Sequence, residues 1–405
     1  MDSVDKYLAE VLAAIVPLAS HEVALADTLG TVLDGDVTAQ WPLPSFDNSA
    51  MDGYAVRAAD VAGASADHPV SLPVVGEIPA GDTASRAIEP GTCIRIMTGA
   101  PMPDGADTVI PVEATDGGTE VVSIREAAER GFSVRLAGGD AQPGDLLLSS
   151  GTRLGAVHVG LLAAAGRAAV RARRRPRVAV ISTGNELIEP GTALVPGQIW
   201  ESNATMLAAA ARQAGCDAHR FPVVRDDTDA VLSAVQSALS GADLLITSGG
   251  VSMGGEHDVV KAALSTLGTV TFRKVAMQPG MPQGFGMVGP GRTPIFTLPG
   301  NPVSAYVSFC LFVLPALDAL QDLSPERNAP RPATLTKPVH SPANKRSFLR
   351  GILDRASDHV TQVTPLTGQA SHQLASLARA NALIIVPEDV TSLAAGAAVD
   401  VLELP

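Results

Sequence analysis

The strongest constraint on the fold is the regular alternation of short apolar strands with helices between residues 177 and 321. The runs "RVAVIS", "ADLLITS" and "TPIFTLP" are apolar and contain many β-branched residues. Amphipathic stretches such as "ATMLAAAARQAG" and "TDAVLSAVQSALSG" separate them. Alternation of this kind predicts a parallel, doubly wound α/β domain, which we place at residues 173–325.

The segment before this domain carries two other patterns. Residues 2–18 have apolar side chains at helical spacing, and "LGAVHVGLLAAAG" (154–166) predicts a second helix. Between them, short β-like runs are cut by Gly and Pro. We therefore expect the two helical parts to pack together around a β-rich insertion. The predicted N-terminal region spans residues 1–172, with helical parts of about 1–44 and 144–172 and an insertion of about 45–143.

The segment after the α/β domain begins with a Pro-rich linker, "LSPERNAPRP" (323–332). Short strands with one helix near 371–378 follow it, so residues 326–405 predict a small, barrel-like β domain. A chain of 405 residues is too long for one hydrophobic core, and 46% apolar residues are enough to build several. The sequence therefore predicts a multidomain protein.

Composition argues against several classes of function. The net charge of −13 opposes binding to a phosphate backbone, and 3% aromatic residues leave little for base stacking. The one dense basic run, "RARRRPR" (171–177), is interpreted as a solvated linker. Cys93, Cys216 and Cys310 are odd in number and far apart, which argues against disulfides and zinc. We expect no nucleic-acid partner.

No basic segment followed by an apolar run is visible at the start, "MDSVDKYLAEVL". The longest apolar stretch, "VSAYVSFCLFVLPAL" (303–317), is short for a bilayer span and contains Pro315. We therefore expect a soluble, cytoplasmic protein with no membrane partner.

Polar and glycine-rich segments follow five successive strands of the predicted α/β domain. In an open sheet of this type, ligands bind beyond the carboxyl ends of the strands. Five such ends on one edge therefore predict a ligand site. The segments are "TGNE" with Glu186, "RDD" with Asp226 and Asp227, "TSGGVSMGGEHD" (247–258), "KVAMQPGMP" (274–282) and "LPGNPVS" (298–304).

The segment 247–258 has the composition of an anion-binding loop. Gly249 and Gly250 permit a close backbone approach, and Ser248 and Ser252 offer hydroxyl groups. A helix is predicted soon afterwards, so its first N–H groups could hold a phosphate. The alternative is a tight βα turn that needs glycine for packing. The spacing matches neither the Walker A motif nor GxGxxG, so an ordinary nucleotide-binding fold is not indicated.

Carboxylates at these strand ends are open to two interpretations. Glu186, Asp226, Asp227 and Asp258 could each cap a helix or lie in its first turn. Grouped near a phosphate, they would instead suit Mg²⁺, which prefers oxygen ligands and bridges to substrate phosphates. We expect Mg²⁺ as the cofactor, with Asp226 and Asp258 as its protein ligands. His257 is interpreted as a surface residue at a helix start.

Six motifs carry a resemblance to a known family. They are "FDNSAMDGYAVR", "RIMTGAPMPDGAD", "AGGDAQPGD", "ISTGNEL", "SGGVSMG" and "LPGNPVSA". In this order they resemble the molybdopterin molybdenumtransferases, the MoeA family, which includes the gephyrin E domain. The resemblance spans nearly the whole chain, including the C-terminal β domain. "SGGVSMG" alone is less specific, because related molybdopterin-binding domains share it.

The resemblance implies an elongated homodimer with a cleft shared between subunits. It implies a Mg²⁺-dependent reaction in which adenylylated molybdopterin and molybdate form the molybdenum cofactor and AMP leaves. Contacts with other proteins of cofactor biosynthesis are also expected. By motif, the implied catalytic residues are Asp52, Thr98, Glu186, Asp226, Asp258 and Lys274. The implied substrate-binding residues are Arg135, Asp140, Ser248, Gly249, Gly250, Ser252, Pro299, Gly300, Asn301, Ser304, Arg350 and Ser371.

One stretch departs from the family pattern. Where many members read Lys-Pro-Gly-Lys-Pro, this chain has Gln278 and Met281 in place of the two lysines and keeps the prolines and glycine. We interpret the stretch as the wall of a ligand site with altered charge, and expect weaker molybdate binding. Two alternatives stay open. One is a non-catalytic molybdopterin-binding or scaffolding paralogue, and the other is a hydrolase of phosphate esters or nucleotide amides.

Overall fold

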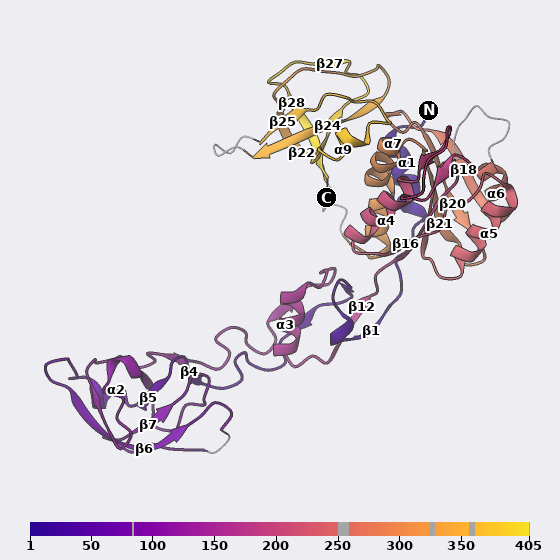
Figure 1. Ribbon diagram of the computed structural model, residues 1–405. Helices are drawn as coiled ribbons and strands as arrows, with labels where there is room; N and C mark the ends of the chain where they lie inside the picture. The colour runs from indigo at the N-terminus through magenta and orange to yellow at the C-terminus, as the bar shows by residue number, and fades with distance from the viewer. Residues whose placement is uncertain (83–84, 250–258, 324–328, 356–360, 405) are drawn as a thin grey trace.

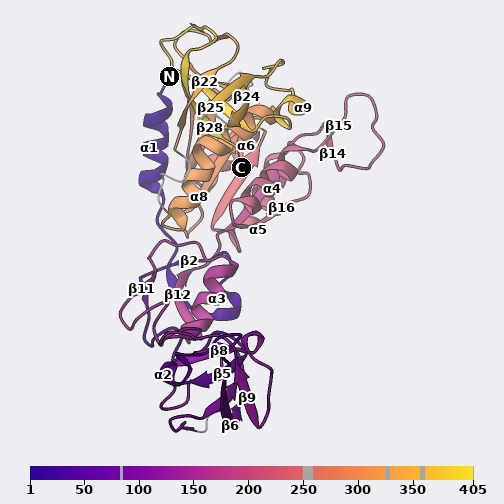
Figure 2. The same cartoon turned by 90° about the vertical axis from the view of Figure 1, so that its left-hand side faces the viewer.

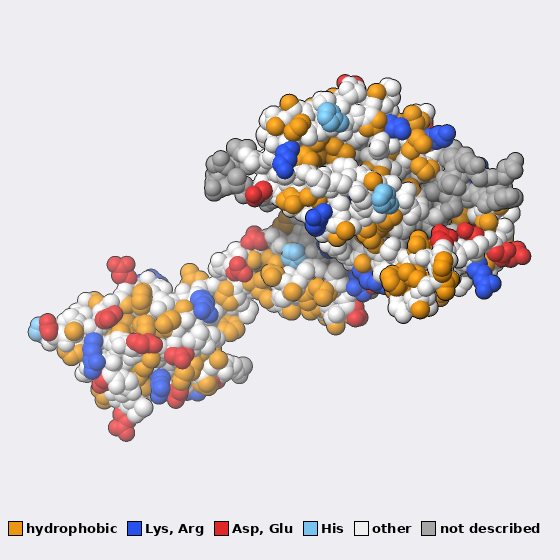
Figure 3. All heavy atoms as spheres, turned by 45° about the horizontal axis from the view of Figure 1, so that its top comes forward, with side chains coloured by type: hydrophobic (Ala, Val, Ile, Leu, Met, Phe, Trp, Pro, Cys, Tyr) orange, Lys and Arg blue, Asp and Glu red, His pale blue; other side chains and the backbone are white. Residues whose placement is uncertain are grey.

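The computed structural model describes residues 1–82, 85–249, 259–323, 329–355 and 361–404. The chain is elongated, with a β-rich domain at one end and a small middle domain next to it (Figures 1 and 2). The α/β domain and the C-terminal β domain lie together at the other end. Acidic and basic side chains are interspersed over the visible face of the β-rich domain (Figure 3).

The α/β domain is built on a six-stranded mixed sheet of order β16-β13-β17-β21-β20-β18. The first four strands are parallel, as predicted. β20 is antiparallel to both of its neighbours, so the carboxyl ends of the other five strands lie on one edge. The strands are β13 (Arg177–Ser182), β16 (Asp217–Arg220), β17 (Leu244–Ser248), β18 (Gly268–Lys274), β20 (Pro282–Val288) and β21 (Thr293–Leu298).

The sequence analysis did not predict β20, because two glycines and a proline obscure its pattern. Gly286 is required there by close packing against β18. A Cβ at this position would lie 2.0 Å from the backbone oxygen of Thr269. Glycine therefore allows the two edge strands to approach, although it is unfavourable in strands generally.

Helices cover both faces of this sheet. α4 and the C-terminal helical segment pack on one face, and α5 and α6 pack on the other. The helices are α4 (Asn203–Gln213), α5 (Thr228–Leu239), α6 (Val259–Leu267), α7 (Pro302–Ser308), the π-helical η3 (Phe309–Val313) and α8 (Leu314–Leu320). Within the described residues, Pro302–Leu320 is long and apolar enough to span a membrane, but 78% of it is buried inside the protein. It is a core helix.

The N-terminal helix α1 (Val4–Ala14) does not pack with the middle domain, which corrects the prediction of one N-terminal unit. Its apolar side chains Val4, Tyr7 and Val11 join the core of the α/β domain. Tyr7 makes an edge-to-face contact with Phe312 in η3, with ring centroids 4.8 Å apart. The apolar stripe was visible in the sequence, but a stripe does not specify which core it enters.

The middle domain contains more strand than helix, contrary to its description as helical. An antiparallel sheet of order β1-β12-β2 and the pair β3–β11 pack with one helix around Leu33, Leu154 and Leu162. The elements are β1 (Ser20–Ala24), η1 (Leu25–Asp27), β2 (Val32–Leu33), β3 (Val37–Thr38), β11 (Leu146–Leu148), α3 (Ala156–Ala164) and β12 (Ala169–Arg173).

The basic run 171–177 is not a free linker, because its arginines pair with acids on both sides. Arg173 Nη1 lies 2.6 Å from Asp34 Oδ1, and its Nη2 lies 3.1 Å from Asp322 Oδ2. Arg174 Nη2 donates to Asp243 Oδ1 at 2.6 Å. The run thus joins the middle domain to the α/β domain. Sequence alone could not show this, because the acids are distant along the chain.

The predicted β-rich domain is present as a five-stranded sheet of order β8-β5-β7-β6-β9. Apolar clusters pack on both of its faces. Two neighbouring segments connect it to the middle domain, and Leu43 pairs with Ala141 there. The elements are β4 (Asn48–Ser49), β5 (Gly53–Val56), α2 (Ala58–Val61), β6 (Val70–Ile78), β7 (Cys93–Ile96), β8 (Thr108–Pro111), η2 (Val112–Ala114), β9 (Val121–Ile124) and β10 (Val134–Arg135).

The C-terminal domain is a small closed β-barrel, as predicted. Its strands follow the order β24-β25-β22-β28-β26, and β26 pairs back onto β24. Phe348, Leu377 and Leu383 of this domain join the core of the α/β domain. The elements are β22 (Arg331–Leu335), β23 (Val339–His340), β24 (Arg346–Arg355), β25 (Thr361–Pro365), α9 (Leu374–Leu377), β26 (Ala382–Val386), β27 (Ser392–Leu393) and β28 (Ala398–Glu403).

Candidate functional site

A cavity of about 410 Å³ lies at the carboxyl edge of the α/β sheet. The ends of β13 and β17, the loop after β21 and the start of α4 form its floor. The short strands β14 (Leu187–Ile188) and β15 (Ile199–Trp200) form one wall, and His372 and Leu374 come from the C-terminal domain. This is the edge at which the sequence predicted a ligand site.

Asn203, the first residue of α4, ties the floor together. Its Nδ2 donates to Ser248 Oγ at 2.9 Å and to Gly300 O at 2.7 Å. Ser248 Oγ in turn donates to Pro299 O at 3.4 Å. The side-chain oxygen of Asn203 is buried without a hydrogen-bond partner. One amide therefore fixes the loops after β17 and β21, which also contain three predicted residues, Ser248, Pro299 and Gly300.

Glu201 is a functional candidate that the sequence analysis missed. The residue is only 2% exposed, and its carboxylate accepts hydrogen bonds from Ser182 Oγ at 2.9 Å and Thr205 Oγ1 at 3.0 Å. It also accepts from the backbone N–H of Ala204 at 2.6 Å, which caps the start of α4. The stretch "ESNAT", in which an acid and polar residues directly precede a predicted helix, could have indicated this role of Glu201.

The approach of an anion to the backbone of Gly249 stays a prediction, but the alternative, a tight turn in which this glycine is needed for packing, is supported. Its φ is +96°, and a Cβ would lie 2.9 Å from Thr183 O and 3.3 Å from Thr183 Oγ1. Thr183 is 5% exposed and lines the cavity, and its hydroxyl has no hydrogen-bond partner among the described residues. Gly250, Ser252, His257 and Asp258 lie outside the described residues.

The strand-end carboxylates divide into separate roles. Glu186 lines the cavity. Asp226 does not line it, but its N–H donates to Asn185 Oδ1 at 3.3 Å, which places it close to the Glu186 loop. Asp227 caps α5, because its Oδ2 accepts from Ala230 N–H at 3.0 Å. Among the described residues, no group of three His, Cys, Asp or Glu side chains is arranged to hold a metal ion.

Four further predicted residues lie around this edge. Lys274 ends β18 with an exposed side chain and does not line the cavity. Asn301 lines the cavity and precedes α7, without a side-chain capping bond. Ser304 is buried in α7, and the carbonyl of Ser371 accepts from Val303 N–H at 3.1 Å. The contact ties the start of α7 to the C-terminal domain.

Arg350 is fully buried in β24, which is unusual for an arginine. Its Nη2 donates to the carbonyls of Gly368 and Ala370, and its Nε donates to Ser376 Oγ at 3.4 Å. Nη1 has no hydrogen-bond partner. Burial lowers the pKa of the guanidinium. The group is therefore held on one side and has a free donor on the other.

The stretch 274–288 joins two domains. Its strand β19 (Met277–Gln278) pairs in parallel with β24 of the barrel. The Gln278 side chain is exposed and lines a second cavity, of about 260 Å³, against the C-terminal domain. Gly280 has φ +97°, and buried Gln283 donates to its carbonyl at 2.6 Å. The turn therefore has an ordered shape, as expected from its proline and glycine residues.

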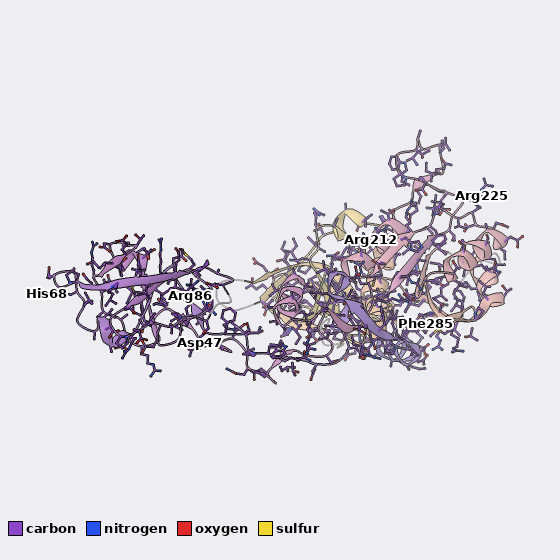
Figure 4. All side chains as sticks on the ribbon, turned by 90° about the horizontal axis from the view of Figure 1, so that it is seen from below. Asp47, His68, Arg86, Arg212, Arg225 and Phe285 are labelled. Carbon is purple, nitrogen blue, oxygen red and sulfur yellow. The ribbon has the colours of Figure 1, made fainter. Side chains whose placement is uncertain are left out.

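The remaining predicted residues are far from the first cavity. Asp52 Oδ1 accepts from the backbone N–H and the hydroxyl of Thr98, both at 2.7 Å. These bonds, the backbone one first, lower the pKa of Asp52. Arg135 and Asp140 are exposed where the β-rich domain joins the middle domain. Figure 4 shows this separation, with labelled residues of the β-rich domain at one end and Arg212 and Arg225 at the other.

Three regions of the chain match models of known families. Residues 2–166 match the MoeA N-terminal region (domain I and II), and residues 179–319 match a probable molybdopterin binding domain. Residues 332–404 match the MoeA C-terminal region (domain IV). The matched regions together cover most of the chain, as the motif resemblance predicted.

Full-length relatives and a solved structure agree with these matches. Molybdopterin molybdenumtransferase 2 of Mycobacterium tuberculosis is 47% identical over 405 residues, which cover 98% of both chains. Molybdopterin molybdenumtransferase of Bacillus subtilis is 37% identical, covering 94% of this chain and 89% of the relative. The molybdopterin biosynthesis MoeA protein from Pyrococcus horikoshii has 32% identity and a TM-score of 0.77, covering 99% of this chain and 98% of that one. The chain therefore belongs to the MoeA family of molybdopterin molybdenumtransferases.

Proposed function

We propose that this protein is a molybdopterin molybdenumtransferase of molybdenum cofactor biosynthesis, which inserts molybdate into adenylylated molybdopterin with release of AMP. The observation that supports the proposal is the cavity at the carboxyl edge, whose floor is held together by Asn203. The chain that forms this cavity matches the family along its length. A cavity of about 410 Å³ has the size of a small-molecule site.

The chemistry of the floor suits a phosphate ester. Among the described residues, the buried hydroxyl of Thr183 has no hydrogen-bond partner, and Gly249 packs against Thr183 with no side chain of its own on the floor. Donors fixed before the ligand arrives stabilise developing negative charge without rearrangement. The cavity floor therefore supports binding of the pyrophosphate that links AMP to the pterin.

Mg²⁺ fits the donors on the cavity rim. It keeps several waters and binds through one or two carboxylates together with substrate phosphates, so a complete protein cage is not needed. Glu186 lines the cavity, and Asp226 is held beside the same loop. When bound, the ion would neutralise charge on the departing AMP phosphate. Asp258 stays a predicted ligand outside the described residues.

Arg350 supports binding of a tetrahedral oxyanion such as molybdate. A buried cation with one free N–H group requires an acceptor, and charge-assisted bonds to oxyanions are stronger than neutral ones. Ser371 and Ser304 flank the junction of the two domains near the start of α7. These residues keep the molybdate-binding role that the motifs implied.

The assembly and location proposed for the enzyme follow the family pattern. We propose a cytoplasmic homodimer in which the β-rich domain of one copy completes the cleft of the other. The β-rich domain, which contains Asp52 and Thr98, lies away from the α/β domain within one chain, and this supports the arrangement. Contacts with other proteins of cofactor biosynthesis are also proposed, and no nucleic-acid or membrane partner.

The test is a complete reaction with defined components. Purified protein is incubated with adenylylated molybdopterin, molybdate and Mg²⁺, and both AMP and active cofactor are measured, the latter by reconstituting an apo-molybdoenzyme. Parallel reactions omit molybdate or remove the metal with a chelator. Release of AMP with cofactor formation supports the proposal. Tight pterin binding without AMP release would instead indicate the non-catalytic, scaffolding paralogue.

A further inference from the structure

An arm of the α/β domain, residues 187–200, carries one of the two tryptophans of the chain into the wall of the first cavity. The arm begins with β14, ends with β15 and stands out from the domain (Figure 2). Trp200 is 50% exposed, and the neighbouring Ile199 is 56% exposed. Because Trp200 is half exposed and lines the first cavity, ring surface is available there to a ligand.

The position of the indole ring is fixed. Trp200 Nε1 donates to Thr192 O at 2.8 Å, across the loop of the arm. The base of the arm is held by Arg220, whose Nη1 lies 3.2 Å from Glu189 Oε1. The hydrogen-bonding edge of the ring is therefore satisfied within the arm, and apolar ring surface is left at the cavity.

The cavity has two chemically different sides. Its floor is polar, with Ser182, Thr183 and Asn203, whereas Trp200, Ile199 and Leu187 form an apolar wall. A ligand that matches both sides has a charged phosphate at one end and a flat, apolar-faced ring at the other. Planar heterocycles stack on aromatic side chains independently of their hydrogen-bonding pattern.

We propose that Trp200 is the platform on which a planar heteroaromatic ring of the substrate stacks, while its phosphate lies on the floor. The inference rests on the proposed function for the identity of the substrate. The shared chemistry is a flat nitrogen heterocycle, which is either the adenine or the pterin. Trp200 is thus a positioning residue that directs the phosphate end toward Thr183 and Asn203.

The two tryptophans provide a direct readout of ring contact. Trp41, the other one, is 71% exposed and belongs to a different part of the chain. In a Trp41→Phe variant, Trp200 is the sole indole, so whichever ring stacks on it, that of AMP or that of 6-hydroxymethylpterin, should quench its fluorescence with saturation. Ribose 5-phosphate, which has the phosphate but no ring, should leave the emission unchanged. The Trp41→Phe variant should retain full activity.

Calorimetry with substituted variants distinguishes the two rings. AMP, 6-hydroxymethylpterin and ribose 5-phosphate are titrated into wild-type protein, Trp200→Leu and the matched control Trp41→Leu. Removing the stacking surface should raise the Kd of the ring that uses it by at least about tenfold, as for base–aromatic stacking elsewhere. Trp200→Phe should recover part of the affinity. Ribose 5-phosphate should bind all variants equally.

Several outcomes would overturn the platform role. One is equal affinity of wild-type protein and Trp200→Leu for both rings, and another is failure of both rings to bind the wild type. A third is a change in sedimentation of Trp200→Leu without a change in ring affinity, which would make Trp200 an interface residue. The transfer reaction is measured separately. If the wild type is active and Trp200→Leu binds both rings as tightly as the wild type does, only the platform role is contradicted. Ring quenching in a protein without transfer activity contradicts only the proposed function.

Discussion

In the part of the α/β domain that the structure describes, three buried threonine hydroxyls make no hydrogen bond to described residues, and one of the three reaches the cavity. Thr183 lines the cavity, whereas Thr247 and Thr297 are fully buried in neighbouring strands. A buried hydroxyl without a partner is unfavourable. The unfavourable free energy of the unpaired hydroxyl of Thr183 has a functional explanation, because a ligand can supply the missing acceptor.

Thr183→Val tests this explanation. Valine keeps the shape and removes the hydroxyl, so stability in denaturant should stay equal or rise, while the Kd for AMP should increase about threefold to tenfold, the worth of one hydrogen bond. The matched control is Thr297→Val, which removes an equally buried hydroxyl away from the cavity and should leave AMP binding unchanged. Equal AMP binding by the two variants would show that the Thr183 hydroxyl has no ligand.

Gln278 and Met281 define a second test at the residue scale. Gln278 lines the smaller cavity against the barrel, and a neutral side chain there forms weaker bonds to an oxyanion than a lysine would. Gln278→Lys combined with Met281→Lys should lower the molybdate concentration needed for half-maximal turnover. Gln236→Lys combined with Ser237→Lys, at exposed positions of α5, adds the same charge away from this cavity and serves as the control. An unchanged molybdate requirement in the double variant would mean that this wall does not face the anion.

Sequence reasoning succeeds at single residues whose type is dictated by the local conformation of the backbone. Gly249 was given packing in a tight turn as an alternative role, and its positive φ and close contact with Thr183 support that alternative. Asp227 was correctly given a helix-capping alternative. Glu201 and Thr183 escaped notice because their importance depends on burial among partners that are distant along the chain. Burial cannot be read from a single residue type.

At the scale of elements, the edge strands β18 and β20 depend on one small residue. Gly286→Ala should force the strands apart, because the new methyl group would overlap the Thr269 carbonyl, and overpacking of this kind costs about 1–3 kcal/mol. Gly291→Ala is the control, since only Thr293 Oγ1 at 3.8 Å lies near its added Cβ. Urea denaturation of both variants gives the comparison. Equal midpoints would contradict the close-packing argument.

The strands and helices of the α/β domain were predictable because their apolar periodicity is strong. The parallel order, the carboxyl edge and the long helix after it follow from that pattern. The docking of α1 and the strand β20 were not predictable in the same way. α1 could have packed on any apolar surface, and the glycines of β20 look like a loop until the neighbouring strand is in place.

At the scale of the whole molecule, Asp34 connects the middle domain to the basic run. Hydrogen bonds, first from Ser20 and then from Arg171 and Arg173, lower the pKa of Asp34 to about 2. A carboxylate with a lowered folded-state pKa stabilises the fold above its unfolded value of about 3.9, and this contribution is lost as the pH falls toward 2. Wild-type protein should therefore lose stability between pH 4 and about 2.

Asp34→Asn should reduce this pH dependence, as measured by thermal unfolding at low ionic strength. Asp36→Asn removes the same charge two residues away and controls for the change in net charge. If Asp34→Asn keeps the wild-type slope below pH 4, the ion pairs of Asp34 with Arg171 and Arg173 do not contribute to the stability of the fold.

The proposed cleft between two copies of the chain predicts complementation between inactive variants. Asp52→Asn damages the β-rich domain, and Asn203→Ala damages the cavity floor. A hybrid of the two variants would contain one intact cleft, so mixing them equally after reversible dissociation should restore about a quarter of wild-type activity in a two-fold dimer. Each variant mixed with itself is the control. No recovery in verified hybrids would place both residues in the same cleft of one chain.

The pairing of Leu43 with Ala141 means that the chain enters and leaves the β-rich domain at the same point. A domain joined in this way is an insertion into the fold. If it were removed, the two ends of the remaining chain would already be neighbours. Its internal sequence can change, or its angle to the rest can vary, without disturbing the register of any strand in the α/β sheet. The reach and chemistry of the domain that carries Asp52 can therefore evolve separately from the cavity it serves.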